Sequence, residues 1–429
     1  MRCLLILLTA LLLGNILISQ PPYAGNYEQM RQYEGEYRQP DKSLLQIAAS
    51  PKDGNLYMID RGRKYLLRLN GNDIFFNPSN EQLVFTRDKK GNVNGYAISG
   101  QKFPLARKTP GDIRLWYARE PEGTKKYVYK RSLRPKLNDG INIGGIGAAG
   151  LDKDRIREMV DKVVDGTYPD VHSILIARNG KLIVEEYFYQ YDRNTQHQLR
   201  AATGSVISAL MGIALGKGFI SGIDDSVETH FPGFSAGANG DQPVTVRELL
   251  SSATGHSCGY SEDSCFSNAV MVGRFIEKLS KQQLVAFARD NLFGPLGIRQ
   301  YEWKFEPEKQ EAAMESQLFL KPRDMLKFGM MYLDNGQWDG RPVIPPGWVR
   351  ESLAKQTGAG EEDYGYIWWL DEMEAGGKQF MSCSARGSGG QRIYLFPEHE
   401  LVVVITGGSF DSEPSSDLIV VNHVLTGLE

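Results

Sequence analysis

A hydroxyl and an amine three residues apart on one face of a helix can act together as a nucleophile and its base. Ser352-Leu-Ala-Lys355 has this spacing, at the end of a short segment that we expect to be a peripheral helix. Acyl transfer also needs a proton source for the leaving group and an oxyanion hole. Because the spacing alone is a weak signal, we interpret Ser352 and Lys355 as a coincidence.

Residues 201–217 are almost all apolar or small, which predicts a helix buried on every side rather than an amphipathic surface helix. Such a core helix is a rigid element from which functional side chains can be presented. Ser205 lies within it, but the Ser-x-x-Lys spacing places no amine or imidazole beside this hydroxyl. An unassisted serine is a poor nucleophile at neutral pH.

From about Leu151 to its C-terminus the chain resembles the serine hydrolases of the class C beta-lactamase, penicillin-binding protein and 6-aminohexanoate-oligomer hydrolase group. The similar blocks follow one another in the family's order, at residues 172–188, 199–220, 245–250, 292–298, 322–329, 364–369 and 385–391. The resemblance implies an α/β (α+β) fold, in which helices pack on one antiparallel sheet beside a helical lobe. It also implies a cleft between the sheet and the lobe.

In this family the nucleophile and base come from a Ser-x-x-Lys motif at the start of the core helix. The gap-free register places Ala201 at the serine and Gly204 at the lysine. The tyrosine of the family's Tyr-x-Asn motif falls on Ser264 and its asparagine on Phe266. A two-residue deletion would instead align Phe266-Ser-Asn268, again without the phenol. The resemblance therefore implies a hydrolase scaffold that lacks its reactive atoms.

A glycine-rich stretch, Ala385–Gln391, resembles the strand that walls the family's cleft. Its glycines would let a ligand approach the backbone, and an N–H there would complete an oxyanion hole. An equally good interpretation is that packing alone requires the glycines. Arg386 would face an anionic ligand or lie exposed on the surface. The residues that we expect to line the cleft are Thr203, Tyr260, Phe266, Arg386, Gly387, Gly389 and Gly390.

Three functional hypotheses follow. The leading one is a catalytically impaired hydrolase, a pseudoenzyme that keeps its cleft for a small amide, a peptide or a cell-wall-like ligand. The alternative is an active amidase or esterase with a displaced nucleophile, for which the candidates are Ser205, Ser264, Tyr260 and Cys383. The third is a structural protein with a collapsed cleft, in which the N-terminal β-domain carries the function.

The first 20 residues are typical of a secretory signal, because Arg2 precedes the apolar run Leu4–Ile18. We therefore expect export to the periplasm or the cell exterior. The cleavage site is poor in small residues, so an uncleaved membrane anchor is the alternative. Export would permit a disulfide. Cys258 and Cys265 flank a short loop and could close it, leaving Cys383 over; three unpaired thiols are the other interpretation.

Residues 21–108 contain short, often alternating apolar runs separated by Gly, Asn, Asp and Pro, which predicts a small antiparallel β-domain. The runs are 27–37, 44–49, 56–60, 65–69, 73–76, 83–87 and 92–98. Tyr33–Tyr37 and Phe85–Asn92 resemble the lipocalin-like accessory domain often fused to this hydrolase family. Residues 109–150 are expected to be a connector, and 151–429 the hydrolase-like domain. The latter should contain helices 152–164 and 415–425, with strands 173–177, 182–188, 391–396 and 401–406.

Composition excludes several functions. The net charge is −3, and the Lys and Arg residues are dispersed, so we expect no nucleic-acid partner. The glycine-rich stretch 138–150 lacks the strand-and-helix context of a nucleotide-binding loop. The six histidines show no metal-ligand spacing, and His172 and His197 are expected to be structural. We therefore expect neither a metal ion nor another cofactor.

Overall fold

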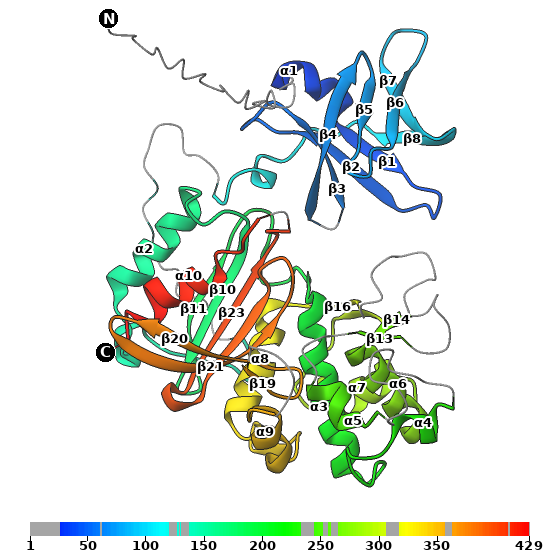
Figure 1. The fold of residues 1–429 in the computed structure, drawn as a ribbon. Coiled ribbons are helices and arrows are strands. Elements are labelled where there is room, and N and C mark those ends of the chain that lie inside the picture. Colours follow the sequence, from blue (N-terminus) through cyan, green and yellow to red (C-terminus); the bar gives the residue numbers. More distant parts are fainter. Residues whose placement is uncertain are drawn as a thin grey trace, which may run out of the picture. The chain divides into compact units, whose positions relative to one another are not determined.

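The computed structural model describes residues 26–60, 62–119, 127, 129, 137–232, 244–251, 256–258, 265–305, 317–356, 363–410 and 412–428. For 256–258 and 265–267 it describes the backbone alone. The chain forms two compact units, which divide between Asp112 and Ile113 (Figure 1).

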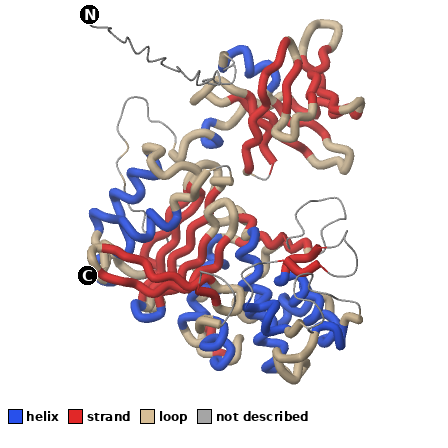
Figure 2. The backbone as a smooth tube through the Cα atoms, in the orientation of Figure 1, coloured by secondary structure: helices blue, strands red, loops and turns tan. Residues whose placement is uncertain are grey.

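The N-terminal unit is a closed antiparallel barrel in which eight strands pair in sequence order (Figure 2). Aromatic side chains fill its interior, as expected for a barrel of this size, with Tyr37, Phe75, Phe85 and Tyr96 all at most 3% exposed. The strands are β1 (Gly35–Arg38), β2 (Leu44–Ala49), β3 (Leu56–Asp60), β4 (Arg63–Gly71), β5 (Ile74–Phe76), β6 (Gln82–Arg87), β7 (Val93–Ile98) and β8 (Gln101–Arg107).

Two parts of the barrel differ from the sequence-based expectation. The apolar run 27–37 begins as helix α1 (Tyr27–Met30) and turn η1 (Arg31–Tyr33), because the Asn26 side chain caps the helix by accepting from the Glu28 N–H. Strand β8, which closes the barrel against β1, was not among the predicted strands.

An eight-stranded sheet forms the centre of the C-terminal unit, with the order β19-β20-β21-β22-β23-β10-β11-β9. Every neighbouring pair is antiparallel except β9 and β11, so part of the expected connector joins this sheet. The strands are β9 (Asn142–Ile143), β10 (Val171–Arg178), β11 (Lys181–Tyr187), β19 (Asp363–Tyr364), β20 (Trp369–Ala375), β21 (Lys378–Arg386), β22 (Arg392–Phe396) and β23 (Leu401–Gly407).

Helices cover both faces of this sheet. Strand β10 shows the division, because Ile174 and Ile176 enter one core cluster while Leu175 and Ala177 enter the other. Helices α2 (Lys153–Val164) and α10 (Ser416–Ile419), with the π-helical continuation η7 (Val420–Leu425), pack on the first face. Helix α8 (Pro322–Leu333) packs on the second, against β10, β22 and β23.

The helical lobe lies beside the sheet (Figure 1). Its buried side chains belong to the same core cluster as Leu175 and Ala177 on the second face of the sheet. Its central helix is α3 (Thr203–Gly216), which the sequence predicted as a core helix and in which the residues from Thr203 to Ala214 are buried. The fold class is therefore confirmed. The remaining elements are η4 (Arg200–Ala202), α4 (Val227–His230), α5 (Val246–Ser251), α6 (Asn268–Ser280), α7 (Leu284–Ala288), η5 (Arg289–Phe293), α9 (Pro346–Ser352), β12 (His197–Gln198), β13 (His256–Cys258), β14 (Cys265–Ser267), β15 (Glu302–Lys304), β16 (Gln317–Leu320), β17 (Gln337–Trp338) and β18 (Arg341–Pro342), with turns η2 (Ile113–Leu115), η3 (Gly147–Ala149) and η6 (Pro397–His399).

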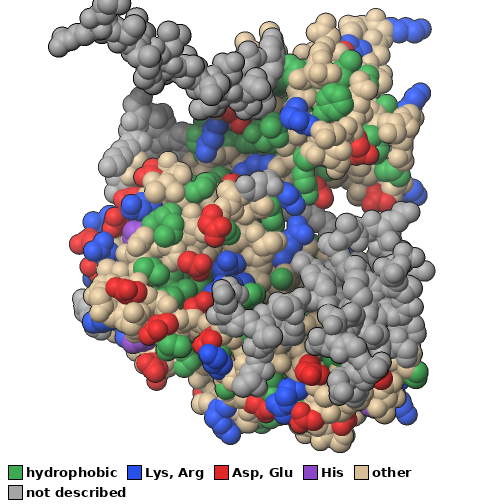
Figure 3. Space-filling view, viewed as in Figure 1, with side chains coloured by type: hydrophobic (Ala, Val, Ile, Leu, Met, Phe, Trp, Pro, Cys, Tyr) green, Lys and Arg blue, Asp and Glu red, His purple; other side chains and the backbone are tan. Residues whose placement is uncertain are grey.

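Among the described residues, no helix combines the length and the apolar character that a membrane crossing requires. The expected signal segment, residues 1–20, lies outside the described residues. On the face drawn in Figure 3, acidic and basic side chains are interspersed over the described surface rather than gathered by sign.

Candidate active site

The start of α3 is where the sequence places the nucleophile. Turn η4 precedes the helix, and the Leu199 N–H anchors it by donating to the Leu318 carbonyl at 2.9 Å. Arg200 has φ +55°, a left-handed conformation that non-glycine residues seldom adopt. Ala201 is exposed, whereas Ala202 and Thr203 are both 2% exposed. The nucleophile position is therefore accessible, but it carries only a methyl group.

The base position, Gly204, is closed by packing. A Cβ atom added to Gly204 would lie 2.6 Å from Ile367 Cγ2 and 3.5 Å from Ala269 Cβ. The first separation is too short for any real contact, so a lysine side chain could not leave the helix here without displacing Ile367. The structure thus fills the volume of the expected amine with a hydrocarbon side chain.

Ile367 is held in place from two sides. The Ser205 hydroxyl donates to its carbonyl at 2.6 Å, and its own N–H donates to the Leu250 carbonyl at 2.9 Å. Its φ is +58°, which is unfavourable for a β-branched residue and persists only where surrounding contacts enforce it. The contacts with α3 and α5 supply that enforcement.

The glycine-rich stretch lies against the start of α3. A Cβ atom on Gly387 would lie 2.4 Å from the Leu199 carbonyl oxygen, and one on Gly389 would lie 2.5 Å from the Phe410 ring. These close approaches explain both glycines by packing. Phe410 in turn lies beneath the Arg200 guanidinium, 5.0 Å from the ring centre.

The backbone N–H groups of this stretch are already bonded within the protein. Gly387 donates to the Gln391 carbonyl at 2.9 Å, Gly389 to Gln391 Oε1 at 2.8 Å, and Gly390 to the Gly387 carbonyl at 3.3 Å. Gln391 Nε2 donates to the Gly407 carbonyl at 2.8 Å, which fixes the amide. A ligand oxygen bound to any of these three N–H groups would have to replace an existing bond.

Two polar groups at the start of α3 remain without a partner. Arg200 Nε and Thr203 Oγ1 are buried and make no hydrogen bond within the part of the chain that the structure describes. Buried polar groups are normally satisfied, so these two atoms distinguish the start of α3 from the surrounding core.

Comparisons with known proteins identify the family of the C-terminal unit. The family model described as Beta-lactamase matches residues 156–419, more than half of the chain. The chain belongs to the beta-lactamase family. No curated protein matches it closely enough in sequence to be reported beside the family.

Solved structures share the beta-lactamase fold with the C-terminal unit. The putative 6-aminohexanoate-dimer hydrolase from Bacillus anthracis is 15% identical with a TM-score of 0.51, over 66% of this chain and 84% of that one. A class C beta-lactamase is 14% identical with a TM-score of 0.51, over 65% and 96%. A penicillin-binding protein homologue from Caulobacter crescentus is 14% identical with a TM-score of 0.50, over 65% and 99%. Identities this low establish the fold alone.

Arg386 is engaged by its own sheet in this beta-lactamase-family chain. Its guanidinium forms an ion pair with Asp371, donates through Nε to Ser384 Oγ at 2.9 Å, and stacks on Trp369 with 5.1 Å to the ring centre. An anionic ligand would have to compete with the Asp371 carboxylate for this side chain.

The described alternatives to the family nucleophile are poorly placed. Ser205 is 1% exposed and bonded to Ile367, and Ser352 is completely buried and donates to the Val349 carbonyl at 3.1 Å. Lys355 pairs with Asp363 rather than with Ser352. Burial raises the pKa of the Cys383 thiol to about 12, with a further contribution from Asp371, so the thiolate is scarce at neutral pH.

The expected tyrosine region is only partly described. Ser264 and Tyr260 lie outside the described residues, and Phe266 is described by its backbone alone. Strands β13 and β14 pair Cys258 directly opposite Cys265. Residues opposite each other in antiparallel strands have Cα atoms about 4.5–5.5 Å apart, within the range of disulfides. The Cys258–Cys265 disulfide stays a prediction, now with a backbone register that permits it.

His172 and His197 form a buried pair near the same helix start. His172 Nδ1 lies 2.9 Å from His197 Nε2, and the Tyr191 ring stacks on His172 with 4.0 Å between centres. Burial lowers the pKa of His197 to about 4, so this imidazole is neutral at pH 7. No group of three or more His, Cys, Asp or Glu side chains suited to a metal ion occurs among the described residues.

Sequence reasoning found Ala201, Gly204 and the glycine-rich stretch but missed Ile367 and Phe410. Residues 364–369 were identified from the sequence only as one of the blocks that resemble the family. Nothing in the sequence signals that Ile367 reaches Gly204, since the two lie far apart along the chain and meet only in the folded unit. Phe410 carries no motif of its own and is found only by its contacts with Gly389 and Arg200.

Proposed function

We propose that this chain is a non-hydrolytic member of the beta-lactamase family that binds a small amide, peptide or cell-wall-like ligand at the start of α3 without cleaving it. The observation that carries the proposal is the position of Ile367 Cγ2, which lies where a side chain on residue 204 would begin. A family member without serine at 201 and lysine at 204 lacks both the nucleophile and its base. The proposal includes export by means of the N-terminal segment.

Binding is supported by what remains at the site. Ala201 is exposed, so a ligand can reach the helix start. The unpartnered Arg200 Nε and Thr203 Oγ1 offer a cationic N–H and a hydroxyl to a carbonyl or carboxylate oxygen. A ligand that bound these atoms would remove the cost of leaving them unsatisfied, about 1–3 kcal/mol for a neutral group.

The alternative is an amidase or esterase that uses a displaced nucleophile. The burial and bonding of Ser205 and the raised pKa of Cys383 weigh against these two candidates. Ser264 and Tyr260 remain as candidates that only a chemical experiment can address.

Covalent labelling with a fluorophosphonate and with a fluorescent penicillin separates the two functions. The native chain should remain unlabelled, and Ala201→Ser/Gly204→Lys should label slowly or not at all because Ile367 blocks the lysine. Adding Ile367→Gly should increase labelling, and peptide mapping should place the label on residue 201. Labelling of the native chain at a single residue would establish the displaced nucleophile and overturn the proposal.

Thermal unfolding tests the binding half with two probes, penicillin G and the linear dimer of 6-aminohexanoate. A probe at 100 times its Kd should stabilise the folded chain by about 2.7 kcal/mol. Arg200→Gln should reduce this shift, whereas Arg289→Gln, which alters an exposed arginine of the same lobe, should not. No shift with either probe would favour the collapsed cleft and a structural role.

A further inference from the structure

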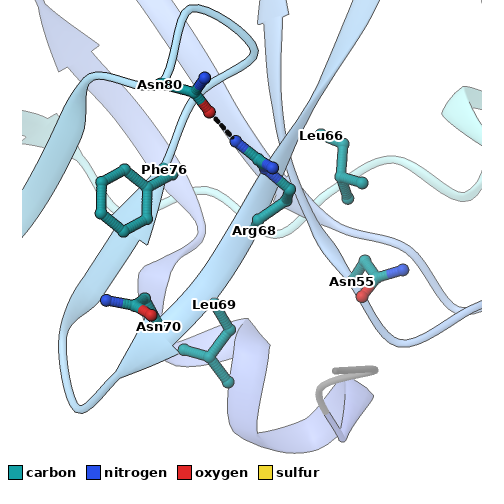
Figure 4. A pocket seen from close by; sticks show the side chains of 7 residues that line it. All are labelled: Asn55, Leu66, Arg68, Leu69, Asn70, Phe76 and Asn80. Atoms are coloured by element: carbon teal, nitrogen blue, oxygen red, sulfur yellow. Dashed lines mark hydrogen bonds between the residues drawn. The ribbon is translucent and has the colours of Figure 1, made fainter. Parts of the chain in front are cut away.

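The N-terminal barrel has a pocket of its own, with a volume of about 490 Å³ (Figure 4). This volume falls within the range of about 300–1,000 Å³ that small-molecule sites occupy. Its lining combines three carboxamides and one guanidinium with two leucines and one aromatic ring: Asn55, Leu66, Arg68, Leu69, Asn70, Phe76 and Asn80.

Strand pairing brings the centre of the pocket together. Arg68 and Phe76 are direct partners in the β4–β5 register, and Asn55 comes just before β3, whose first residue Leu56 pairs with Leu67. Leu67 and Phe75 belong to the barrel core. Because side chains alternate along a strand, Arg68 and Phe76 face outward. The pocket therefore opens on the outer wall of the barrel, and one lining residue, Leu69, also packs against the barrel interior.

The guanidinium in this pocket is held in position. Asn80 has φ +59°, a left-handed conformation that asparagine tolerates, and its N–H donates to the Asn77 carbonyl at 3.0 Å. Its side-chain oxygen accepts a hydrogen bond from Arg68 Nη2, drawn as the dashed line in Figure 4. This bond uses one of the five N–H groups of a guanidinium, so it orients Arg68 and leaves donors for a ligand.

We propose that this pocket binds an acidic saccharide, a sugar unit that carries a carboxylate. Carboxamides both donate and accept, which matches the hydroxyl groups of a sugar. The Phe76 ring and the leucines match the C–H faces of a sugar ring. Arg68 is the only ionisable side chain in the described lining, and a guanidinium pairs with a carboxylate through parallel hydrogen bonds.

Other ligand classes fit the lining less well. A lipid chain would desolvate the three carboxamides without replacing their hydrogen bonds with water. A nucleoside diphosphate or triphosphate would concentrate several negative charges at a single guanidinium, whereas an acidic saccharide carries one charge on each sugar unit. The combination of amides, one cation and apolar contacts favours a ligand that is mostly neutral, rich in hydroxyl groups and singly charged per unit.

Isothermal titration of the full chain with trigalacturonate, maltotriose and acetate tests the proposal. Trigalacturonate should bind at least tenfold more tightly than maltotriose, which lacks the carboxylates, and than acetate, which lacks the sugar. Arg68→Gln should weaken trigalacturonate binding about tenfold, and Phe76→Ala several-fold. Asn94→Ala is the matched control, because Asn94 is exposed on β7 and outside the pocket lining; it should leave binding unchanged.

Asn70→Ala provides a second test that does not depend on Arg68. Asn70 is exposed, so its truncation should preserve the fold while weakening trigalacturonate binding. Circular dichroism confirms folding of each variant. The proposal is overturned by failure of trigalacturonate to bind, by equal binding of acetate, or by folded Arg68→Gln and Asn70→Ala variants that bind as the native chain does.

Discussion

Helix α8 and the start of α3 are both buried in the C-terminal unit, yet they contain opposite kinds of polar group. In α8, Arg323, Asp324 and Lys327 are 4%, 7% and 3% exposed, and all three are ion-paired. Arg323 reaches Asp139 and Glu185, each at 2.8 Å. Lys327 lies 3.2 Å from Asp324 on the same helix.

Within α3 itself, the buried polar groups of the first turn are neutral, because Arg200 precedes the helix in η4. Thr203 and Ser205 are hydroxyls, Gly204 has no side chain, and the nearby His197 is neutral at pH 7 because burial lowers its pKa. A buried charge is tolerated where acceptors from other elements surround it. Around Arg323 the fold supplies two carboxylates, whereas beside Gly204 it supplies Ile367. A lysine at 204 would therefore have no space for its side chain.

The largest expected effect comes from removing one partner of the α8 network. Arg323→Ala leaves Asp139 and Glu185 without their cation and should lower the free energy of unfolding by about 3–5 kcal/mol. Urea denaturation followed by tryptophan fluorescence measures the loss. Arg289→Ala, which breaks an exposed pair with Asp290, should leave the midpoint unchanged. A loss in both variants would show that the effect is not specific to burial.

The second largest effect should come from lowering the pH, which protonates the neutral histidine near the start of α3. The pKa of His197 falls to about 4 in the folded chain, against about 6.5 when unfolded, so the unfolded state binds the extra proton between these values. Stability should therefore fall as the pH drops from 6.5 to 4, by about 1.4 kcal/mol per pH unit. His197→Gln should remove this component, and His230→Gln should retain it. Urea midpoints measured from pH 4 to pH 8 test this prediction. If the native chain and His197→Gln lose stability equally on acidification, the assignment to His197 is refuted.

A smaller effect is expected from one methyl group at the base position. Gly204→Ala places Cβ 2.6 Å from Ile367 Cγ2, so overpacking should cost about 1–3 kcal/mol. In an Ile367→Ala background the cost should largely disappear, giving a coupling energy of about 0.5–3 kcal/mol. Gly222→Ala is the control, since a Cβ there meets nothing within 4 Å. Additive losses in the double variant would mean that the two residues do not compete for space.

The smallest effect belongs to the exposed nucleophile position. Ala201→Ser should change the free energy of unfolding by less than about 0.5 kcal/mol, as do most surface substitutions. Without a base beside it, the new hydroxyl should react with a fluorescent penicillin no faster than the native chain. Rapid labelling of this single variant would reveal another base at the site. The start of α3 would then not be limited to neutral groups, in contrast to what we infer from its comparison with α8.

The parts of the fold that depend on local pattern could be predicted from the sequence. Alternating side chains identified strands such as Leu44–Ala49, and continuous apolar character identified α3 as a core helix. Strand β8 was not predicted, and the helical turn at Tyr27–Met30 was interpreted as part of an apolar run. The first depends on closure of the barrel, and the second on a single capping side chain.

The candidate site also combines features that the sequence shows with features that only the folded chain shows. The substitutions at 201 and 204 are visible in sequence because a motif defines those positions. The role of Ile367 is not visible, because it depends on a left-handed backbone and on a contact between distant segments. Similarly, the engagement of Arg386 by Asp371 follows from the pairing of β20 with β21, which only the folded sheet reveals.

The Ile367 side chain also limits which substitutions the start of α3 can accept. A lysine introduced at 204 would meet a steric conflict with Ile367 before it could take part in any reaction. If the chain is non-hydrolytic, as proposed, its conversion into a hydrolase would need three coordinated substitutions, at 201, 204 and 367. The change at 367 would confer no activity by itself.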